Sequence, residues 1–339
     1  ATIDSASFLL HDNRLRGTAT SLKKNEQETL TITEGDFTTC EPTSNTWAIR
    51  GKEIELIKAQ GYGIARHATL RVKGVPVAYS PYFRFPIDDS RQSGFLWPSI
   101  GRDSDGGTEV AIPYYFNLRP NLDATYILRS IWKRGVMHEG ELRYLNNYGE
   151  NLLAGAFLPS DDEYNERERV ISSSASGFDK QDRWLAHFSH KGRAGPWSSS
   201  VNYTSVSDID YLDDLGGFTN TNSDFSNALG NSKDPALLRA GTVSYNTTSW
   251  RSTLELRSFQ EISSIKSNQY EILPRLTISG SKSFGQINSS ALLQATVFDN
   301  PSDKKSEGSR IVADIRSSAP FHNSWGYITP GLRYIHRNY

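Results

Sequence analysis

The chain has 339 residues with 37 basic and 38 acidic side chains, so its formal charge of -1 gives no electrostatic reason to expect a nucleic-acid partner. Its mean hydropathy of -0.53 suits a soluble protein, yet 11% of the residues are aromatic, a combination that outer-membrane barrels share because their lumen-facing side chains are polar. The sequence contains no apolar run of about 18 residues that would form a transmembrane helix, and residues 1–10 lack the basic start and cleavage site of a signal peptide.

Residues 1–85 contain short alternating segments that predict a soluble β-sandwich or roll. Leu30 and Ile32 alternate with polar residues, and so do Ile54 and Leu56. The simplest interpretation of the apolar positions is a closed core, but an open roll would use the same residues to line a trough for acyl chains. The candidate trough residues are Phe8, Leu30, Ile32, Phe37, Ile54, Leu56 and Leu70.

Cys40 is the only cysteine of the chain. Taken alone, it is interpreted as a buried thiol, because free cysteines are among the most buried residues. In an oxidising compartment it would instead require a disulfide partner, which this chain does not offer. Further on, residues 74–94 combine three prolines with a charged end and predict a junction between two domains.

In residues 86–339, apolar and polar residues alternate over longer segments, and this pattern predicts antiparallel strands with one apolar face. The clearest segments are 110–118, 122–129, 184–189, 254–257 and 311–316. Segments of about 10 residues have the length of a tilted strand that crosses a bilayer. Short connections alternate with long polar ones at 159–181 and 206–236, as in outer-membrane barrels. Tryptophans lie near segment ends, where an aromatic girdle is expected: Trp97, Trp132, Trp197, Trp250 and Trp325.

About 13 strands are predicted from residue 95 onward. Single-chain bacterial barrels have even strand numbers, and an odd set leaves an open edge whose unpaired backbone is costly in lipid. We therefore expect part of a larger barrel. A soluble sandwich also alternates, so periodicity alone does not exclude it.

The stretch "FLWPSIGRDSDGGTEVAIPYYFNL", residues 95–118, predicts two neighbouring strands joined by a turn at residues 105–107. Pro98 and Pro113 each fall within one of these strands, although proline cannot donate to a sheet ladder. From the residues alone, the expected explanation is a bulge or a bend at a barrel rim.

No strong catalytic or metal-binding motif is present. "DIDYLDDL", residues 208–215, has four carboxylates but lacks the order of an EF-hand loop, so a solvated loop is the preferred interpretation. The histidines have no zinc spacing, and there is no G-x-S-x-G elbow. We therefore expect no enzyme, no metal and no cofactor.

Three stretches carry a set of motifs in a fixed order: "FTTCEPTSNTWAIRGKEIEL", "VPVAYSPYFRFPIDDSRQSGFLWPSIGR" and "PYYFNLRPNLDATYILRSIWKRGVMHEGELRYL". They resemble the LptD (OstA/Imp) family of outer-membrane proteins that assemble lipopolysaccharide (LPS). The resemblance implies an all-β fold in which a periplasmic β-jellyroll precedes a transmembrane β-barrel. Residues 1–85 match the later part of the jellyroll, and residues 86–339 match about the first half of the barrel.

The resemblance also implies a function and partners. The jellyroll would receive LPS from a periplasmic bridge of LptA and LptC, the lipoprotein LptE would plug the barrel, and LPS would leave sideways into outer-membrane lipid. Pro98 and Pro113 match proline positions beside this lateral gate. Cys40 matches a cysteine that joins jellyroll to barrel through a disulfide.

The favoured interpretation is thus LPS transport at the bacterial outer membrane, with the N-terminal part facing the periplasm. A general porin or receptor barrel with an N-terminal β domain is the alternative. A soluble carbohydrate-binding β protein is the third, and segment length and aromatic ends disfavour it.

Overall fold

The structure is a computed structural model that describes residues 2–10, 15–25, 29–38, 40–41, 46–87, 91–96, 98–103, 106–165, 181–216, 236–262, 269–300 and 307–339. Nearly all of the regular structure in these residues is antiparallel β-strand, which confirms the all-β prediction. The chain divides into two compact units. The first comprises Ala1–Gly94 and Tyr115–Asn117, and the second comprises Phe95–Tyr114 and Leu118–Tyr339.

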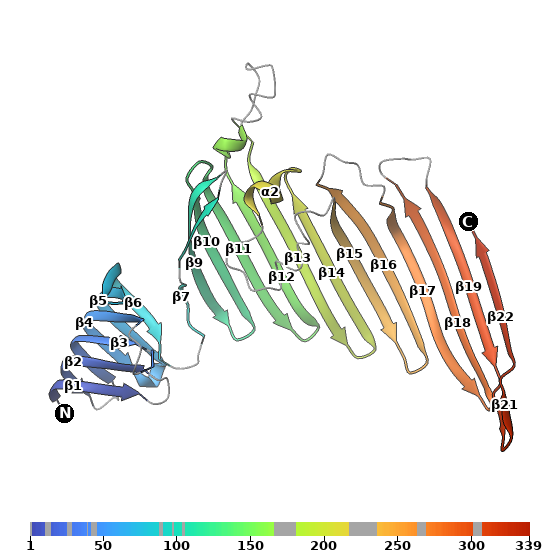
Figure 1. Ribbon diagram of the computed structural model, residues 1–339, viewed down its shortest axis with the longest axis horizontal. Coiled ribbons are helices and arrows are strands. Elements are labelled where there is room, and N and C mark those ends of the chain that lie inside the picture. Colours follow the sequence, from blue (N-terminus) through green and yellow to red (C-terminus); the bar gives the residue numbers. More distant parts are fainter. Residues whose placement is uncertain are drawn as a thin grey trace, which may run out of the picture. The chain divides into compact units, whose positions relative to one another are not determined.

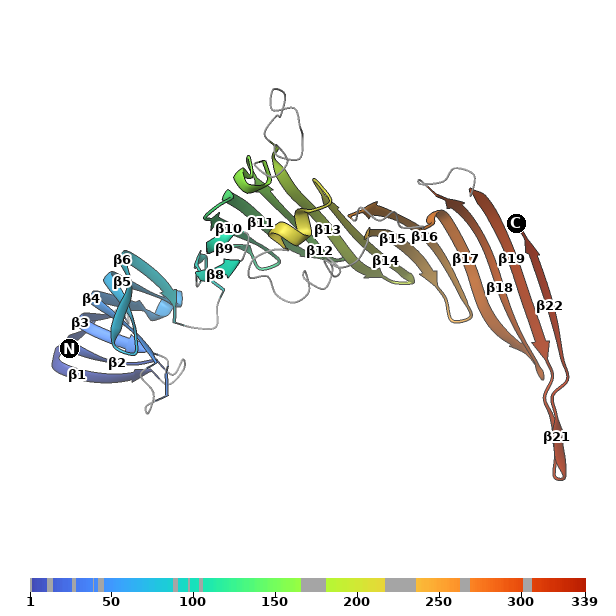
Figure 2. The ribbon, with the colours of Figure 1, turned by 45° about the horizontal axis from the view of Figure 1, so that its top comes forward.

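The first unit is a six-stranded sheet whose strands pair in chain order (Figures 1 and 2). Its strands are β1 (Thr2–Leu10), β2 (Leu15–Lys24), β3 (Thr29–Thr38), β4 (Trp47–Ile57), β5 (Tyr62–Val72) and β6 (Val75–Pro86). A short 3-10 helix, Lys58–Gln60, connects β4 to β5. The core includes Ile32 and Ile54, which are fully buried, and the stacked rings of Phe37 and Phe85, whose centroids are 4.4 Å apart.

A row of irregular positions crosses this sheet and bends its strands. The ladders omit the pairs that Thr20 and Lys52 would make with their neighbours, while Ser5, Glu34 and His67 in the same row have φ of 54°, 46° and 50°. On β3 and β5 the buried positions change from even to odd numbers, or from odd to even, across this row. A bulge-like irregularity shifts the alternation by one residue, so both halves of each strand bury side chains in the same core.

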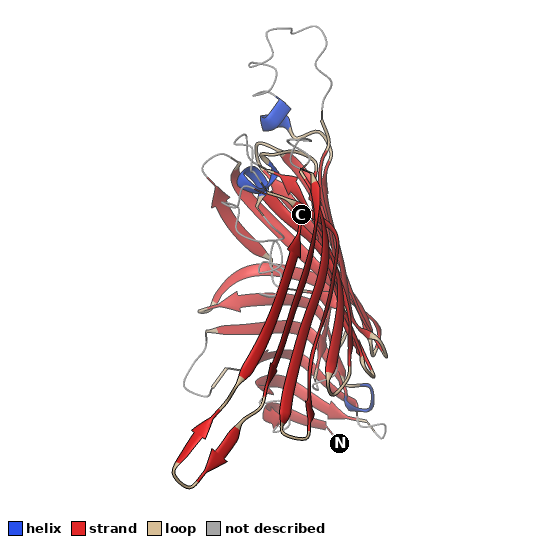
Figure 3. Cartoon of the chain, turned by 90° about the vertical axis from the view of Figure 1, so that its right-hand side faces the viewer, coloured by secondary structure: helices blue, strands red, loops and turns tan. Residues whose placement is uncertain are grey.

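The second unit is a 14-stranded antiparallel sheet, again ordered along the chain (Figures 1 and 3). It contains β7 (Gly94–Phe95), β8 (Ser99–Asp103), β9 (Gly107–Arg119), β10 (Leu122–Ile131), β11 (Gly135–Asn146), β12 (Gly149–Leu158), β13 (Arg183–Ala194), β14 (Trp197–Val206), β15 (Ala236–Asn246), β16 (Trp250–Glu261), β17 (Glu271–Phe284), β18 (Ile287–Asp299), β19 (Gly308–Ser318) and β22 (Gly331–Asn338). A separate hairpin of β20 (Phe321–Asn323) and β21 (Gly326–Ile328) lies between β19 and β22 in sequence.

The strand count differs from the expected 13 because the first predicted strand is divided. Pro98 lies between β7 and β8, outside any strand, and both of these pieces pair with β9. Trp97 and Asp105, which belong to the same predicted hairpin, lie outside the described residues, as do most residues of the loops at 159–181 and 206–236. No helix in the described part of the chain is long and apolar enough to cross a membrane.

The pairing register separates polar from apolar side chains on the two faces of the second unit. Directly opposed residues share a face, and we call the two sides the polar face and the apolar face. One row across the polar face consists of Thr125, Glu141, Ala154, His187 and Thr204, and a second consists of Thr242, Glu255, Arg275, Thr296 and Arg310. The corresponding rows of the apolar face are Leu142, Leu153, Phe188 and Tyr203, and Val243, Leu254, Leu276, Ala295 and Ile311.

The two ends of the sheet also differ. Tight connections such as 119–122, 146–149, 194–197 and 284–287 define a short-turn end. The longer connections 158–183 and 206–236 lie at the opposite, loop end, where the short helix α2 (Tyr211–Leu215) lies against the sheet (Figure 2). Trp197 and Trp250 are at the short-turn end and Trp132 is at the loop end, and all three are exposed.

Candidate functional site

The edge of the second unit at β7, β8 and β9 contains both prolines that the sequence singled out. β8 pairs with β9 from Ser99 opposite Ala111 to Asp103 opposite Gly107. Beyond the break at Pro98, the backbone N–H of Leu96 donates to the carbonyl oxygen of Pro113 over 2.9 Å. The two pieces of the edge strand are therefore joined to β9 on either side of an interruption.

Pro113 removes a donor from the side of β9 that faces this edge. In an antiparallel strand the N–H and C=O of one residue point in the same direction, and two opposed residues of a hydrogen-bonded pair exchange two bonds. The carbonyl of Pro113 accepts from Leu96, but its nitrogen has no hydrogen to donate in return. The ladder at this level therefore has one bond where two are possible.

Side-chain contacts connect this edge to the neighbouring strands β9, β10 and β11. The rings of Phe95 and Tyr114 meet edge to face with centroids 4.9 Å apart. On the polar face, Glu109 of β9 binds Arg129 of β10 at 2.6 Å, and Arg129 also lies 3.5 Å from the buried Glu139 of β11. The edge that lacks one ladder hydrogen bond is thus attached to strands β9, β10 and β11, which ion pairs connect to one another.

A cluster of buried charges lies at the loop end of the polar face. Arg183, which begins β13, binds Asp161 at 2.9 Å, Asp208 at 2.7 Å and Asp214 at 2.8 Å. Arg134 binds Asp161 at 2.9 Å and Asp214 at 3.4 Å. The two arginine side chains are 1% and 2% exposed, so the attraction is little screened by solvent. We call these five residues the charge cluster.

The charge cluster holds the segment that follows β14 against the sheet. Asp208 precedes α2 and Asp214 lies within it, while Tyr211, Leu212 and Leu215 of α2 are buried. They pack on apolar side chains at this end of the polar face: Ile131, Met137, Ala154, Ala156, Leu158, Leu185 and Val206. Burial also raises the pKa of the Tyr211 hydroxyl, which stays protonated.

The preferred interpretation of residues 208–215 as a solvated loop is therefore wrong. Two of the four carboxylates are engaged by arginines, and three apolar side chains are buried. No group of His, Cys, Asp and Glu among the described residues is arranged to hold a metal ion. Sequence reasoning missed Arg134, Arg183 and Asp161, although arginine at the start of an alternating segment is a signal that could have identified Arg183.

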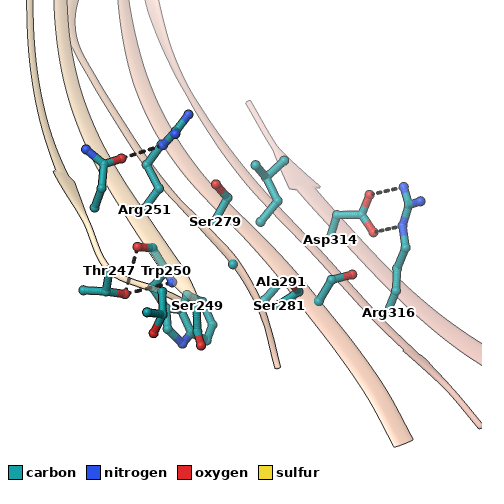
Figure 4. Close-up of a pocket in the computed structure, with 14 residues that line it drawn as sticks. Thr247, Ser249, Trp250, Arg251, Ser279, Ser281, Ala291, Asp314 and Arg316 are labelled. Atoms are coloured by element: carbon teal, nitrogen blue, oxygen red, sulfur yellow. Dashed lines mark hydrogen bonds and ion pairs between the residues drawn. The ribbon is translucent and has the colours of Figure 1, made fainter. Parts of the chain in front are cut away.

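Toward β22, the polar face forms a shallow groove of ≈ 540 Å³ (Figure 4). Asp314 accepts two hydrogen bonds from Arg316, at 3.1 and 2.9 Å, and two from Arg333, at 3.0 and 2.7 Å. The groove is otherwise lined largely by hydroxyl groups, such as those of Ser279 and Ser281. The groove thus presents one carboxylate, the two guanidinium groups of Arg251 and Arg316, and several hydroxyl groups.

In the first unit, the structure brings all seven trough candidates into one apolar cluster. Ile32, Phe37, Ile54 and Leu56 are no more than 3% exposed and belong to the closed core. Phe8, Leu30 and Leu70 are half-buried at the margin of that core.

Cys40 is a half-buried free thiol just after β3. Its backbone N–H donates to the Thr38 hydroxyl at 3.1 Å, and its sulfur lies 3.9 Å from the carbonyl oxygen of Trp47. A side-chain hydrogen bond with Thr38 is the main cause that lowers the pKa of the Cys40 thiol. The surroundings thus favour the thiolate, which is the reactive form in disulfide exchange.

Comparison with known proteins gives a consistent family. A family model described as "LPS transport system D" (LptD) matches residues 181–339. The LPS-assembly protein LptD of Pseudomonas aeruginosa (strain LESB58) is 34% identical over 365 residues, which cover 100% of this chain and 37% of the relative. The proteins of the same name from Pseudomonas savastanoi pv. phaseolicola and Pseudomonas putida (strain W619) are 34% and 33% identical, again over 100% of this chain and 38% of the relative. The chain therefore spans well under half the length of the curated relatives it matches.

Proposed function

Because the chain belongs to the LptD family, we propose that it is part of a protein that transports LPS and inserts it into the outer leaflet of the outer membrane. The first unit would receive the acyl chains, and the second would form part of a barrel wall. The observation that carries this proposal is the register of the second unit, which gives consecutive strands one polar and one apolar face. A wall with two such faces is suited to separate lipid from a polar lumen.

A general porin or receptor barrel would show the same two faces. The relatives that match along the whole chain are named for LPS assembly, and the matching family model is named for LPS transport. These names favour the transport of LPS over general diffusion. The same names refer to transport and assembly, and neither refers to an enzyme activity.

The broken edge at Pro98 and Pro113 would serve as one side of a lateral gate. β7 and β8 have a neighbour only in β9 among the described strands, and the Leu96–Pro113 contact lacks its return hydrogen bond. An edge strand with few ladder bonds separates more readily from whatever strand closes the barrel. In this proposal LPS passes between that closing strand and β7–β8.

We further propose the partners and the orientation. The first unit would lie in the periplasm and accept LPS from an LptA bridge, and LptE would occupy the lumen beside the polar face. Cys40 would form its disulfide with a cysteine outside this chain, which its lowered pKa favours during exchange. Lipid would contact the apolar face.

Acyl chains would contact the margin of the first unit's core. The half-buried Phe8, Leu30 and Leu70 surround fully buried neighbours, so an entering chain would extend an existing apolar cluster. Burial of each methylene of that chain contributes about 0.8 kcal/mol. The fully buried candidates would support these three side chains from below.

Photocrosslinking tests this assignment in the full-length protein within cells that make LPS. A photoreactive amino acid at Leu30 or Leu70 is expected to crosslink LPS. Thr33 is the matched control, because it lies on the same strand as Leu30 but is exposed on the opposite side. Crosslinks of equal yield from Thr33 and Leu30, or none from Leu30 and Leu70, would contradict the proposed entry of acyl chains.

A further inference from the structure

The hairpin β20–β21 continues the ladder of β19 and β22 past the short-turn end of the sheet (Figure 1). Ser318 lies opposite Gly331, and Phe321 lies opposite Ile328, so the register is the same before and after the interruption. The N–H of Ala319 donates to the carbonyl of Pro330 at 3.0 Å within the gap. Pro330 accounts for the missing return bond of this pair, because its nitrogen has no hydrogen to donate to the Ala319 carbonyl.

The composition of this hairpin differs from that of a solvated turn. Residues 319–330 contain no Asp, Glu, Lys or Arg. Trp325 and Tyr327 are each 87% exposed, Ile328 is 67% exposed and Phe321 is 49% exposed. Exposed aromatic and aliphatic groups in such density are unusual for a turn in water and point to a surface that covers them.

The register identifies the side on which the apolar groups lie. Ile315 and Tyr334 form an opposed pair on the apolar face, and counting on by twos along both strands leads to the pair Phe321 and Ile328. The apolar face of the second unit therefore continues into the hairpin without a change of side. Trp325 occupies the turn between the two short strands.

The hairpin also has the size and chemistry of the lipid headgroup region. Three residues per strand at about 3.3 Å each give a length of about 10 Å. Each of the two headgroup layers is about 5–8 Å thick, so a hairpin of this length fits within one layer when it lies along the membrane surface. Trp and Tyr concentrate in these layers because their rings are apolar and carry one polar group. Trp197 and Trp250 already lie at the same end of the sheet.

We propose that β20–β21 is a membrane anchor that lies in the lipid headgroup layer beside the short-turn end of the barrel wall, with Phe321, Ile328 and Trp325 in contact with lipid. This inference rests on the proposed membrane location of the second unit. Lipid is the occupant favoured by continuity with the apolar face and by the absence of charge. The proline-interrupted connection permits the hairpin to bend away from the strand direction and lie along the surface.

A fluorescence experiment on the full-length protein in phosphatidylethanolamine–phosphatidylglycerol vesicles tests the anchor. In a Cys40→Ser background freed of other cysteines, single cysteines at three positions carry an environment-sensitive dye: Trp325→Cys for the hairpin, Trp197→Cys for the proposed girdle and Asn147→Cys for an exposed short turn. Emission at 325 should be blue-shifted and quenched by lipids that carry a spin label near the headgroup. Emission at 147 should be quenched by aqueous iodide.

Two further results separate the anchor from the proposed membrane wall. The first result is that the dye at position 197 is quenched by spin-labelled lipid, while the dye at position 325 is quenched by iodide like that at position 147 or is shielded from both quenchers. This result would contradict the membrane anchor and would still support a membrane location for the second unit. If 197 is not quenched by lipid, the wall and the anchor are both overturned. A Phe321→Asn/Ile328→Asn variant should increase iodide quenching at 325, and no increase would contradict contact through these side chains.

Discussion

Single residues decide how strongly the edge of the second unit is held. Pro98 divides the edge strand, whereas Pro113 lies inside β9 and removes one donor from it. Pro98 thus interrupts the edge strand, and Pro113 reduces the number of hydrogen bonds between the edge strand and β9. The two effects meet at the same level of the sheet, where Leu96 donates to Pro113.

Replacing Pro113 with alanine should strengthen this edge. The Pro113→Ala variant would supply an N–H on the side that already accepts from Leu96, and one added backbone hydrogen bond is worth about 1 kcal/mol net and more in lipid. We expect slower appearance of LPS at the cell surface in the full-length protein, measured by pulse labelling. Pro120→Ala, in the turn after β9, is the control, and equal export rates in both variants would contradict a gating role for Pro113.

Cys40 should ionise at lower pH in the folded chain than in the denatured chain. A lowered pKa increases the thiolate fraction at any pH below the midpoint, so the alkylation rate should rise at lower pH. The measurement is the rate of iodoacetamide reaction against pH for the reduced chain, whose single thiol reports alone. Thr38→Val should move the inflection upward, whereas Thr33→Val should not. An inflection at or above that of the denatured chain would refute the effect.

Arg183 should be the most sensitive member of the charge cluster, since it contacts all three aspartates. Its replacement by methionine leaves buried carboxylates without their main partner and is expected to cost about 3–5 kcal/mol of unfolding free energy. Denaturant titration of the protein in detergent measures this loss. Arg333→Met breaks an exposed pair with Asp314, which solvent screens, and should cost much less. Similar losses in both variants would contradict the special position of Arg183.

At the scale of elements, alternation predicts most strands of the second unit correctly. Successive side chains of a strand point to opposite faces, so a strand with one apolar face repeats apolar residues at every second position. The segment 122–129 falls inside β10, and 254–257 falls inside β16. The bend across the first unit could not be predicted from the sequence, because a one-residue shift of the alternation cannot be recognised within so short a segment. The charge cluster was missed for a different reason: Asp161 and Asp214 are far apart in sequence and meet only when α2 lies against the sheet.

The candidate site shows the same difference between what local sequence patterns predict and what contacts between distant residues determine. The apolar character of Phe8, Leu30 and Leu70 could be read from the sequence, but their position at the margin of a closed core could not, because burial depends on the bend. The break at Pro98 was foreseeable from proline chemistry, whereas the direction of the missing donor at Pro113 required the Leu96 contact. Local rules predict elements, and long-range contacts determine which residues form a site.

The two faces of β16 provide a test at this scale. Leu256 lies on the apolar face and is 47% exposed, while Thr253 lies on the polar face of the same strand. A lysine at 256 would be placed in lipid at a cost of about 2–4 kcal/mol near the bilayer centre. We expect Leu256→Lys to reduce the amount of assembled protein in the outer membrane, measured by heat-modifiable migration. Thr253→Lys should assemble normally, and a reversed order would show that the faces are assigned to the wrong sides.

At the scale of the whole molecule, the two units have separate cores and should respond separately to core mutations. Ile54 is fully buried in the first unit. Ile54→Ala should destabilise that unit by about 2–5 kcal/mol through lost contacts and a cavity. Hydrogen exchange should therefore accelerate in β3 to β5 and remain unchanged in β11 to β13. Accelerated exchange in both sets of strands would show that the units unfold together.

The strict chain order of both sheets has a consequence for how the protein is built. Nearly every strand pairs with the strand just before it in sequence, and the exceptions skip only a short piece: β22 pairs with β19 across the β20–β21 hairpin, and β9 pairs with both β7 and β8. Low contact order of this kind lowers the loop-closure entropy of every step. The sheet can grow one hairpin at a time, and each completed strand is the template for the next. Formation of each sheet would then be a single progressive reaction that follows the order of the strands along the chain.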